Sequence, residues 1–234
     1  MKIKKIFKIF FSLFFLILFL AFTKIKLTPI LGTKMKFSLS VFFGPTLAKI
    51  LGIKLGTGII LLAHFLGILI RIYKLKTIKN LFTFFPIIFA GIYFSKIFKG
   101  EKKLIFIPLI CILLFILHPI GREVWFYCSF WLIPTFVSLF KEKLDKILKF
   151  PLFKIYGYSL GAAFVDHAIG SVIFLYFLKI PAHFWIQAIP LTILERLLIA
   201  GGIEFFYLIE KALMKTFLKV YSLFKVKDFI FEKA

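Results

Sequence analysis

The sequence has few of the residues from which soluble enzymes commonly build their sites. Its only cysteines, Cys111 and Cys128, lie inside apolar runs without CxxC spacing, a pattern typical of small core residues and not of a disulfide framework. The segment GIKLGTG lacks the GK[ST] of a phosphate loop, so ATP use by this chain itself is not indicated. HExxH and GxSxG are also absent. The four scattered histidines, at 64, 118, 167 and 183, predict neither a metal site nor a cofactor.

Acidic residues are also scarce, because ten Asp and Glu stand against 32 Lys and Arg and give a net charge of +22. In a soluble protein this balance would suggest nucleic acid as a partner. Here the lysines cluster between apolar runs, where they would flank membrane spans and meet anionic headgroups. We therefore expect membrane lipids, and not nucleic acid, as partners.

What the chain has in abundance is hydrophobic sequence: 62% of its 234 residues are hydrophobic and the mean hydropathy is +1.02. A soluble domain of this length could not bury so much apolar surface. Apolar runs fall at 7–23, 38–50, 56–72, 82–98, 104–118, 124–140, 155–178 and 184–210. The run 38–50 is short and contains Gly44–Pro45, which indicates a re-entrant segment or a tilted half-helix. The sequence thus predicts an all-α, polytopic membrane helix bundle with six to eight embedded helices, forming one transmembrane domain over residues 1–234 in the cell membrane.

The distribution of lysines predicts the orientation. Lysine-rich segments at 1–6, 96–103, 141–154 and from Lys211 onward are candidate inner loops, so both termini should be cytoplasmic. The short connections 119–123 and 179–183 should face outside. The basic loops Lys24–Lys36 and Arg71–Lys79 would also lie outside in an eight-span count, which leaves the number of early spans open.

The N-terminal segment, the C-terminal tail and the tryptophans each allow a further prediction. The first 23 residues have a basic start and no small-x-small site before Lys24, which favours a retained first span over a cleaved signal peptide. The tail 211–234 alternates lysines with apolar residues, as in a helix lying on the inner headgroups or docking a cytoplasmic partner. Trp125, Trp131 and Trp185 are expected at the membrane interfaces.

Charged residues occur inside the last two apolar runs. Asp166 lies 15 residues before Pro181, in the turn KIPAH, and Glu195 lies 14 residues after it. In an antiparallel helix pair both are about 21–23 Å from the turn, so Asp166–His167 and Glu195–Arg196 should lie at the same depth. We expect Asp166 to pair with Arg196 and His167 to hydrogen-bond Glu195.

Small residues on the same segment, Ala162, Ala163 and Gly170, predict a surface that lets the other helix approach, and Gly157 and Gly161 extend it by a GxxxG. Two interpretations of the charged group stay open. It is either a polar pocket that binds a small solute or ion, or a buried ion pair that only fixes helix register.

Other polar residues are weaker candidates. His64, inside LLAHFLG, is a candidate fourth wall of the pocket or a histidine satisfied by a carbonyl group. In the turn HPIGRE, His118, Arg122 and Glu123 are candidates for an outer mouth, or simply for a capped turn.

Two segments resemble a known family. FSLSVFFGPTLAKILGIKLGTGIILLAHFLG, 37–67, looks like the early helices of the substrate-capture (S) components of energy-coupling-factor transporters. FVDHAIGSVIFLYFLKIPAHFWIQAIPLTILERLL, 164–198, is similar to their closing helices. The resemblance implies a ligand site lined by those polar residues, a vitamin or metal ion as cargo, and association with a membrane coupling subunit and two ATPases.

The leading hypothesis is therefore a solute-binding subunit of a multi-component importer, not an enzyme, with Asp166, His167, Glu195 and Arg196 around the solute. A second hypothesis is an intramembrane enzyme acting on a lipid-linked substrate, with Asp166 or Glu195 as base and His167 as proton shuttle. A third is a structural or assembly protein whose charges only lock helices together.

Overall fold

The computed structural model describes residues 2–29, 36–72, 81–82, 84–178 and 180–231. Its α-helices are α1 (Lys2–Lys24), α2 (Ser40–Ile50), α3 (Ile53–Leu69), α4 (Phe85–Ile97), α5 (Phe106–Leu117), α6 (Pro119–Glu123), α7 (Leu132–Leu139), α8 (Lys141–Ile147), α9 (Pro151–Leu178) and α10 (Ala182–Phe231). The segments η2 (Lys102–Ile105) and η3 (Trp125–Trp131) are 3-10 helices. The predicted all-α helical bundle is confirmed at this level.

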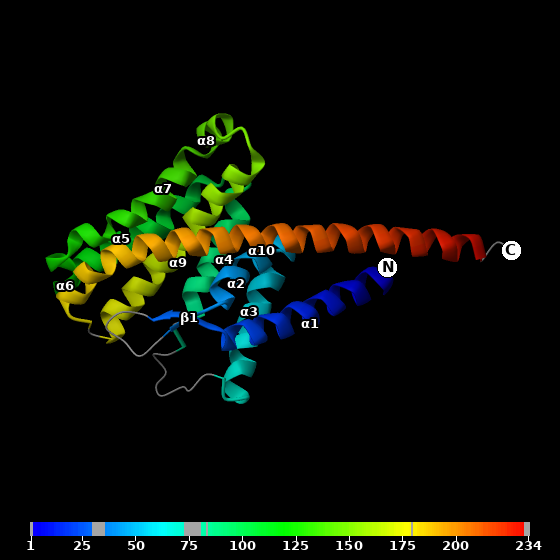
Figure 1. Cartoon of the computed structure of the whole chain (residues 1–234), viewed down its shortest axis with the longest axis horizontal. Helices are drawn as coiled ribbons and strands as arrows, with labels where there is room; N and C mark the ends of the chain where they lie inside the picture. The colour runs from blue at the N-terminus through cyan, green and yellow to red at the C-terminus, as the bar shows by residue number, and fades with distance from the viewer. Residues whose placement is uncertain (1, 30–35, 73–80, 83, 179, 232–234) are drawn as a thin grey trace.

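Among the described residues, a two-stranded antiparallel ribbon is the regular element that is not helical. Strands β1 (Lys26–Pro29) and β2 (Lys36–Ser38) pair between α1 and α2, with Lys26 opposite Ser38. Short strands rich in polar residues cannot bury a face of their own, so the ribbon rests on the helices. It lies at one edge of the bundle, where α1 ends and α2 begins (Figure 1).

Helix α9 lies at the centre, packed against α4, α10, α7 and α5. It joins two groups of buried side chains, one around Phe43, Tyr93 and Ile203, the other around Phe115 and Trp131. Within the described ranges, α9 is the one helix whose length and composition alone would let it cross a membrane; shorter apolar helices lie at 9–24, 53–69, 85–97 and 125–139. The number of embedded helices therefore stays a prediction.

Helices α2 and α3 form a tight hairpin. The turn between them places Gly52 at φ 89°, a conformation that glycine adopts without strain. A Cβ on Gly56 would overlap the backbone of Leu47 and Ala48, so glycine lets the two helices touch. At 11 residues, with Pro45 inside it, α2 is about 16 Å long. The segment 38–50 is thus a short helix that reverses directly into α3.

Helix α10 is 50 residues long and continuous through Pro190. It crosses one face of the bundle and continues beyond it, and both chain ends lie on the same side of the molecule (Figure 1). Residues 211–231, expected as a basic helix or tail, are the continuation of α10, and 232–234 lie outside the described residues. Most of the loop 71–79 lies outside them too.

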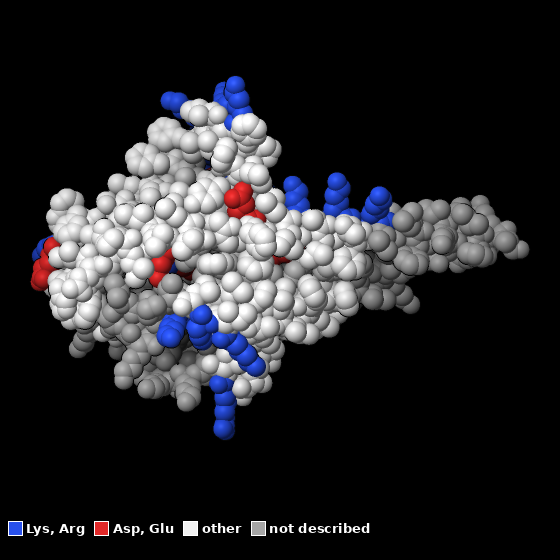
Figure 2. All heavy atoms as spheres, viewed as in Figure 1, with Lys and Arg blue, Asp and Glu red and all other residues white. Residues whose placement is uncertain are grey.

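The surface is strongly apolar. More than forty large hydrophobic side chains are exposed, among them Leu13 and Ile17 on α1 and Leu113 on α5. Figure 2 shows the basic side chains gathered over the α8 end, along the projecting part of α10 and at the lower edge, with a mainly uncharged surface between them. On this face, basic charge is therefore gathered in separate patches, and a few acidic side chains lie between them.

Candidate functional site

The centre of the candidate site, called the Arg196 site or Arg196 cluster below, is an ion pair between the last two long helices, α9 and α10. Arg196 Nη1 on α10 lies 3.0 Å from Asp166 Oδ2 on α9, and the two side chains are 1% and 7% exposed. This contact confirms the predicted pair and the predicted match in depth. The contact forms because α9 and α10 run antiparallel from the turn around Pro181, so residues at equal distances from this turn lie side by side.

Glu195 and the rest of the guanidinium are less completely paired. Glu195 Oε2 lies 3.7 Å from Arg196 Nη2, beyond hydrogen-bond distance. Arg196 Nε and Nη2 and Glu195 Oε1 are buried and have no hydrogen-bond partner. The ring of Phe37, on β2, lies 4.9 Å from Arg196 Cζ in a cation–π contact. The strand β2 thereby covers a guanidinium in which two nitrogens still have no hydrogen-bond acceptor.

His167 belongs to a separate hydrogen-bond chain. Trp131 Nε1 lies 3.0 Å from His167 Nδ1, and Tyr127 Oη lies 2.9 Å from His167 Nε2. An indole N–H only donates, so Nδ1 accepts and the imidazole is neutral with its proton on Nε2. Nε2–H then donates to Tyr127, whose own hydroxyl lies 3.0 Å from Thr192 Oγ1. The predicted hydrogen bond from His167 to Glu195 is wrong, because both ring nitrogens have other partners.

The charges of this cluster do not balance. With His167 neutral, one guanidinium faces two carboxyl groups, Asp166 and Glu195, both buried. An uncompensated charge away from water is costly, so the site favours binding one further proton or cationic group. The unused donors of Arg196 favour an acceptor at the same time. The arrangement suits a small molecule that carries a donor and an acceptor close together.

Sequence reasoning missed four residues of this site: Phe37, Tyr127, Trp131 and Thr192. The run WFYCSFW, 125–131, gave no periodic signal because it folds as a 3-10 helix. Trp125 is exposed, whereas Trp131 is fully buried and Trp185 is 5% exposed. Their expected position at the membrane interfaces stays a prediction. Thr192 could have been found, because it lies one turn before Glu195 and Arg196 on the same helix.

His64 is not brought into the cluster. Its ring stacks on Phe84 with centroids 3.9 Å apart and meets the edge of Phe19 at 5.4 Å. It is thus packed between α1, α3 and the segment before α4. The structure therefore assigns it a place in the aromatic core and not in a wall of the Arg196 site.

The expected outer-mouth residues lie at the α6 end of the bundle (Figure 1). The His118 ring packs 4.9 Å from that of Tyr176, whose hydroxyl donates to the Leu114 carbonyl oxygen. Arg122 and Glu123 are exposed. His118 is therefore part of a packed turn, and its two charged neighbours face outward.

The small residues of α9 serve a different helix from the expected one. A Cβ on Gly161 would collide with the Tyr93 ring of α4, and one on Gly170 would contact Pro86 at the start of α4. Gly157 has nothing within 4 Å of its Cβ position. The prediction that this surface faces α10 is wrong for Gly161 and Gly170, because α4 packs there.

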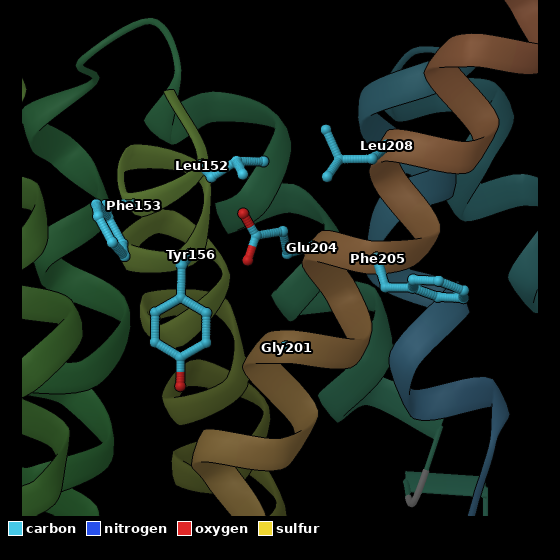
Figure 3. A pocket seen from close by; sticks show the side chains of 7 residues that line it. All are labelled: Leu152, Phe153, Tyr156, Gly201, Glu204, Phe205 and Leu208. Atoms are coloured by element: carbon cyan, nitrogen blue, oxygen red, sulfur yellow. The ribbon is translucent and has the colours of Figure 1, made fainter. Parts of the chain in front are cut away.

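A second polar position lies in an open groove of about 570 Å³ between α9 and α10. Figure 3 shows the Glu204 carboxylate directed into this groove among apolar side chains from both helices. Its Oε1 atom is buried without a hydrogen-bond partner. The groove residues are Leu152, Phe153, Tyr156, Gly201, Glu204, Phe205 and Leu208. None of them belongs to the Arg196 cluster, so the groove is a distinct surface feature.

Metal binding has no support in the described part of the chain, where no three His, Cys, Asp or Glu side chains are grouped to hold an ion.

Comparison with known proteins gives one relative. The chain is 31% identical over 147 residues to the uncharacterized protein MJ0923 of Methanocaldococcus jannaschii, a match that covers 60% of this chain and 50% of the relative. The chain thus spans about half the length of the curated relative it matches. No family model matches it, and no solved structure matches it significantly.

Proposed function

We propose that the chain is a multi-pass membrane protein that binds a small polar solute through Arg196, as the solute-binding subunit of an importer. One observation carries the proposal. Arg196 is 0% exposed, yet two of its guanidinium nitrogens and one oxygen of neighbouring Glu195 have no hydrogen-bond partner. Leaving such a group unsatisfied costs about 1–3 kcal/mol, so buried atoms of this kind mark a place for a ligand group or an ordered water.

The apolar surface supports the membrane part of the proposal. More than forty exposed large hydrophobic side chains would be a severe liability in water. In lipid they are the expected exterior, and the basic patches match headgroup regions. In this proposal α1, α4, α5, the η3–α7 pair, α9 and α10 cross in alternating directions, so that both termini are cytoplasmic. The hairpin of α2 and α3 enters the membrane without a crossing by α2, which is too short to span it.

The buried atoms of the site that have no hydrogen-bond partner suggest the class of solute. Arg196 Nε and Nη2 need an acceptor such as a carboxylate or carbonyl oxygen, and Glu195 Oε1 needs a donor such as an ammonium or N–H group. A zwitterion, or a heterocycle with adjacent carbonyl and N–H groups, supplies both. Such a ligand also supplies the positive or hydrogen-bonding group that the two carboxyl groups lack.

Energy coupling requires partners in this proposal. The chain has no phosphate loop of its own. The resemblance of 37–67 and 164–198 to substrate-capture components favours a membrane coupling subunit and cytoplasmic ATPases as those partners. The projecting basic part of α10 gives such partners an accessible surface on the cytoplasmic side.

A purely structural role is the second candidate, favoured by the 3.0 Å pair between Asp166 and Arg196, which by itself would lock α9 to α10. An enzymatic role has less support. The proton-shuttle hypothesis needs a ring nitrogen of His167 to face a substrate, and both nitrogens are engaged by Trp131 and Tyr127.

A solute screen separates these candidates. Thermal unfolding of the purified chain in detergent would be measured with amino acids, small carboxylates, and heterocyclic vitamins and bases. We expect at least one compound to raise the Tm of the wild type and of Arg122→Gln, whose arginine is exposed, but not of Arg196→Gln. A solute that stabilises all three proteins equally would place its site elsewhere and contradict the proposal.

A further inference from the structure

A second buried acid lies far from the Arg196 site, in the contact between α2 and α10. Glu210 on α10 is 2% exposed, and Thr46 on α2 is fully buried. Thr46 Oγ1 lies 2.6 Å from Glu210 Oε1, across 164 positions of sequence. The other carboxyl oxygen, Oε2, is buried without a hydrogen-bond partner. A carboxyl group with one engaged and one empty oxygen is unusual inside a protein.

The protons at this contact can be counted. Thr46 Oγ1 is also 2.6 Å from the Phe43 carbonyl oxygen, which can only accept a hydrogen bond. The threonine hydroxyl has a single proton, so it cannot donate fully to both oxygens at these distances. If the hydroxyl donates to Phe43, the short contact with Glu210 Oε1 needs a proton from the carboxyl side. A protonated Glu210 that donates to Thr46 satisfies both contacts.

Neighbouring charges do not offer an alternative partner. Lys49, one turn after Thr46 on α2, has its Nζ 3.9 Å from the centroid of the Phe98 ring, and Lys211 Nζ is 5.9 Å from that of Tyr207. On α1, which packs on the same part of α10 through Phe22 and Phe11, the side chains of residues 9–23 carry no charge. Helix α4 presents Phe94 and Phe98 to Tyr207. Among the residues with described side chains, no lysine or arginine comes within ion-pair distance of Glu210, so a proton is the cation that fits.

We propose that Thr46 and Glu210 form a buried proton-binding site between α2 and α10. The proposal does not depend on solute binding at Arg196. Loss of the proton would leave a carboxylate among apolar side chains and weaken the contact between the two helices. Because β2, which carries Phe37, leads directly into α2, the helix that binds this proton also follows the strand that covers Arg196.

Infrared spectroscopy of the full chain in detergent tests this assignment. A protonated carboxyl group gives a carbonyl stretching band that is separate from the amide and carboxylate bands. At neutral pH we expect the wild type to show a component of such a band that Glu210→Gln loses and that Thr46→Val shifts, because its hydrogen bond is gone. Glu142→Gln is the control, because this glutamate on α8 is exposed, and it should leave the band unchanged.

The dependence of stability on pH gives a second, independent readout. A group that is protonated when folded and ionised when unfolded makes the folded state less stable as pH rises. Glutamine copies the protonated form, so Glu210→Gln should be as stable as the wild type below the pKa of an unfolded glutamate, about 4.3, and increasingly more stable than the wild type as the pH rises above it. The proposal is overturned if folded Glu210→Gln keeps the full wild-type band, if the wild type lacks one, or if Glu210→Gln loses stability equally at every pH.

Discussion

Arg196 Nη1 and Asp166 Oδ2 lie 3.0 Å apart although the two residues are 30 positions apart in the chain. Both side chains are almost fully buried, so neither charge can be solvated if the other is removed. We expect Arg196→Gln to lower the free energy of unfolding by about 3 kcal/mol, because it leaves the buried Asp166 carboxylate without its cation, and Asp166→Asn to lower it by less, because Glu195 still faces the guanidinium.

The double variant should be close to the better single variant or more stable than it, with a coupling energy of about 1 kcal/mol or more. Unfolding of all four proteins in the same detergent measures this cycle. Strictly additive losses would mean that the two side chains do not interact.

The hydroxyl of Tyr127 is expected to matter more than its ring. Tyr127→Phe keeps the ring but removes the group that contacts both His167 and Thr192, so it should destabilise the protein by about 1–3 kcal/mol. Tyr156→Phe is the matched control, because its hydroxyl makes an exposed 3.2 Å contact to the Leu197 carbonyl oxygen. Thermal unfolding of both variants checks this, and equal small effects would argue against the His167 hydrogen-bond chain.

The two glycines of the GxxxG on α9 should respond very differently to alanine. Gly161→Ala places a methyl group against the Tyr93 ring, whose hydroxyl is held by the Pro134 carbonyl oxygen, and should cost about 1–3 kcal/mol. Gly157→Ala meets open space and should be neutral or stabilising by up to about 1 kcal/mol. The order of the two Tm values is the measurement, and the reverse order would mean that α4 does not pack on this surface.

Asp145, on the connecting helix α8, is expected to make the free energy of unfolding depend on pH in the acidic range. Burial raises the pKa of Asp145, but hydrogen bonds from Lys141 and Tyr158 lower it more, so the net pKa is below its ordinary value. A depressed native pKa means stabilisation that is present above the unfolded pKa, about 3.9, and lost as pH falls through the native value.

Asp145→Asn should therefore lower the free energy of unfolding at neutral pH by less than about 1 kcal/mol, since solvent screens this partly exposed group. The difference from the wild type should shrink in acid. Glu142→Gln, an exposed acid on the same helix, is the control. Thermal unfolding at neutral and acidic pH checks this, and a pH-independent difference would contradict the role of the Asp145 charge.

The parts of the fold that follow from periodicity and turn position were predictable. Counting residues from Pro181 was enough to pair Asp166 with Arg196, because antiparallel helices of constant rise preserve distance from their turn. Gly44–Pro45 predicted that 38–50 is a short, interrupted segment, and the structure has the 11-residue α2 there. The close contact of α2 with α3 at Gly56 was not predicted.

What could not be predicted depends on the rotation of helices about their axes and on contacts between distant segments. Counting residues from the turn gives the position of His167 along its helix but not the direction of its side chain. The His167 ring faces Tyr127 and Trp131 instead of Glu195. Phe37 reaches Arg196 only through a ribbon that no periodic pattern indicates. Thr46 and Glu210 meet across most of the chain, and nothing local to either residue indicates the other.

Native mass spectrometry of the purified chain, released gently from detergent, tests the central claim most directly. If Arg196 binds a small polar solute, the wild type and Arg122→Gln should carry a small-molecule adduct of one defined mass, retained from the cells or added from the compound screen. Folded Arg196→Gln should lack that adduct. An adduct of unchanged occupancy on Arg196→Gln, or a wild type that takes up no solute retained or added, would contradict the account and leave Asp166 and Arg196 as an ion pair that only joins two helices.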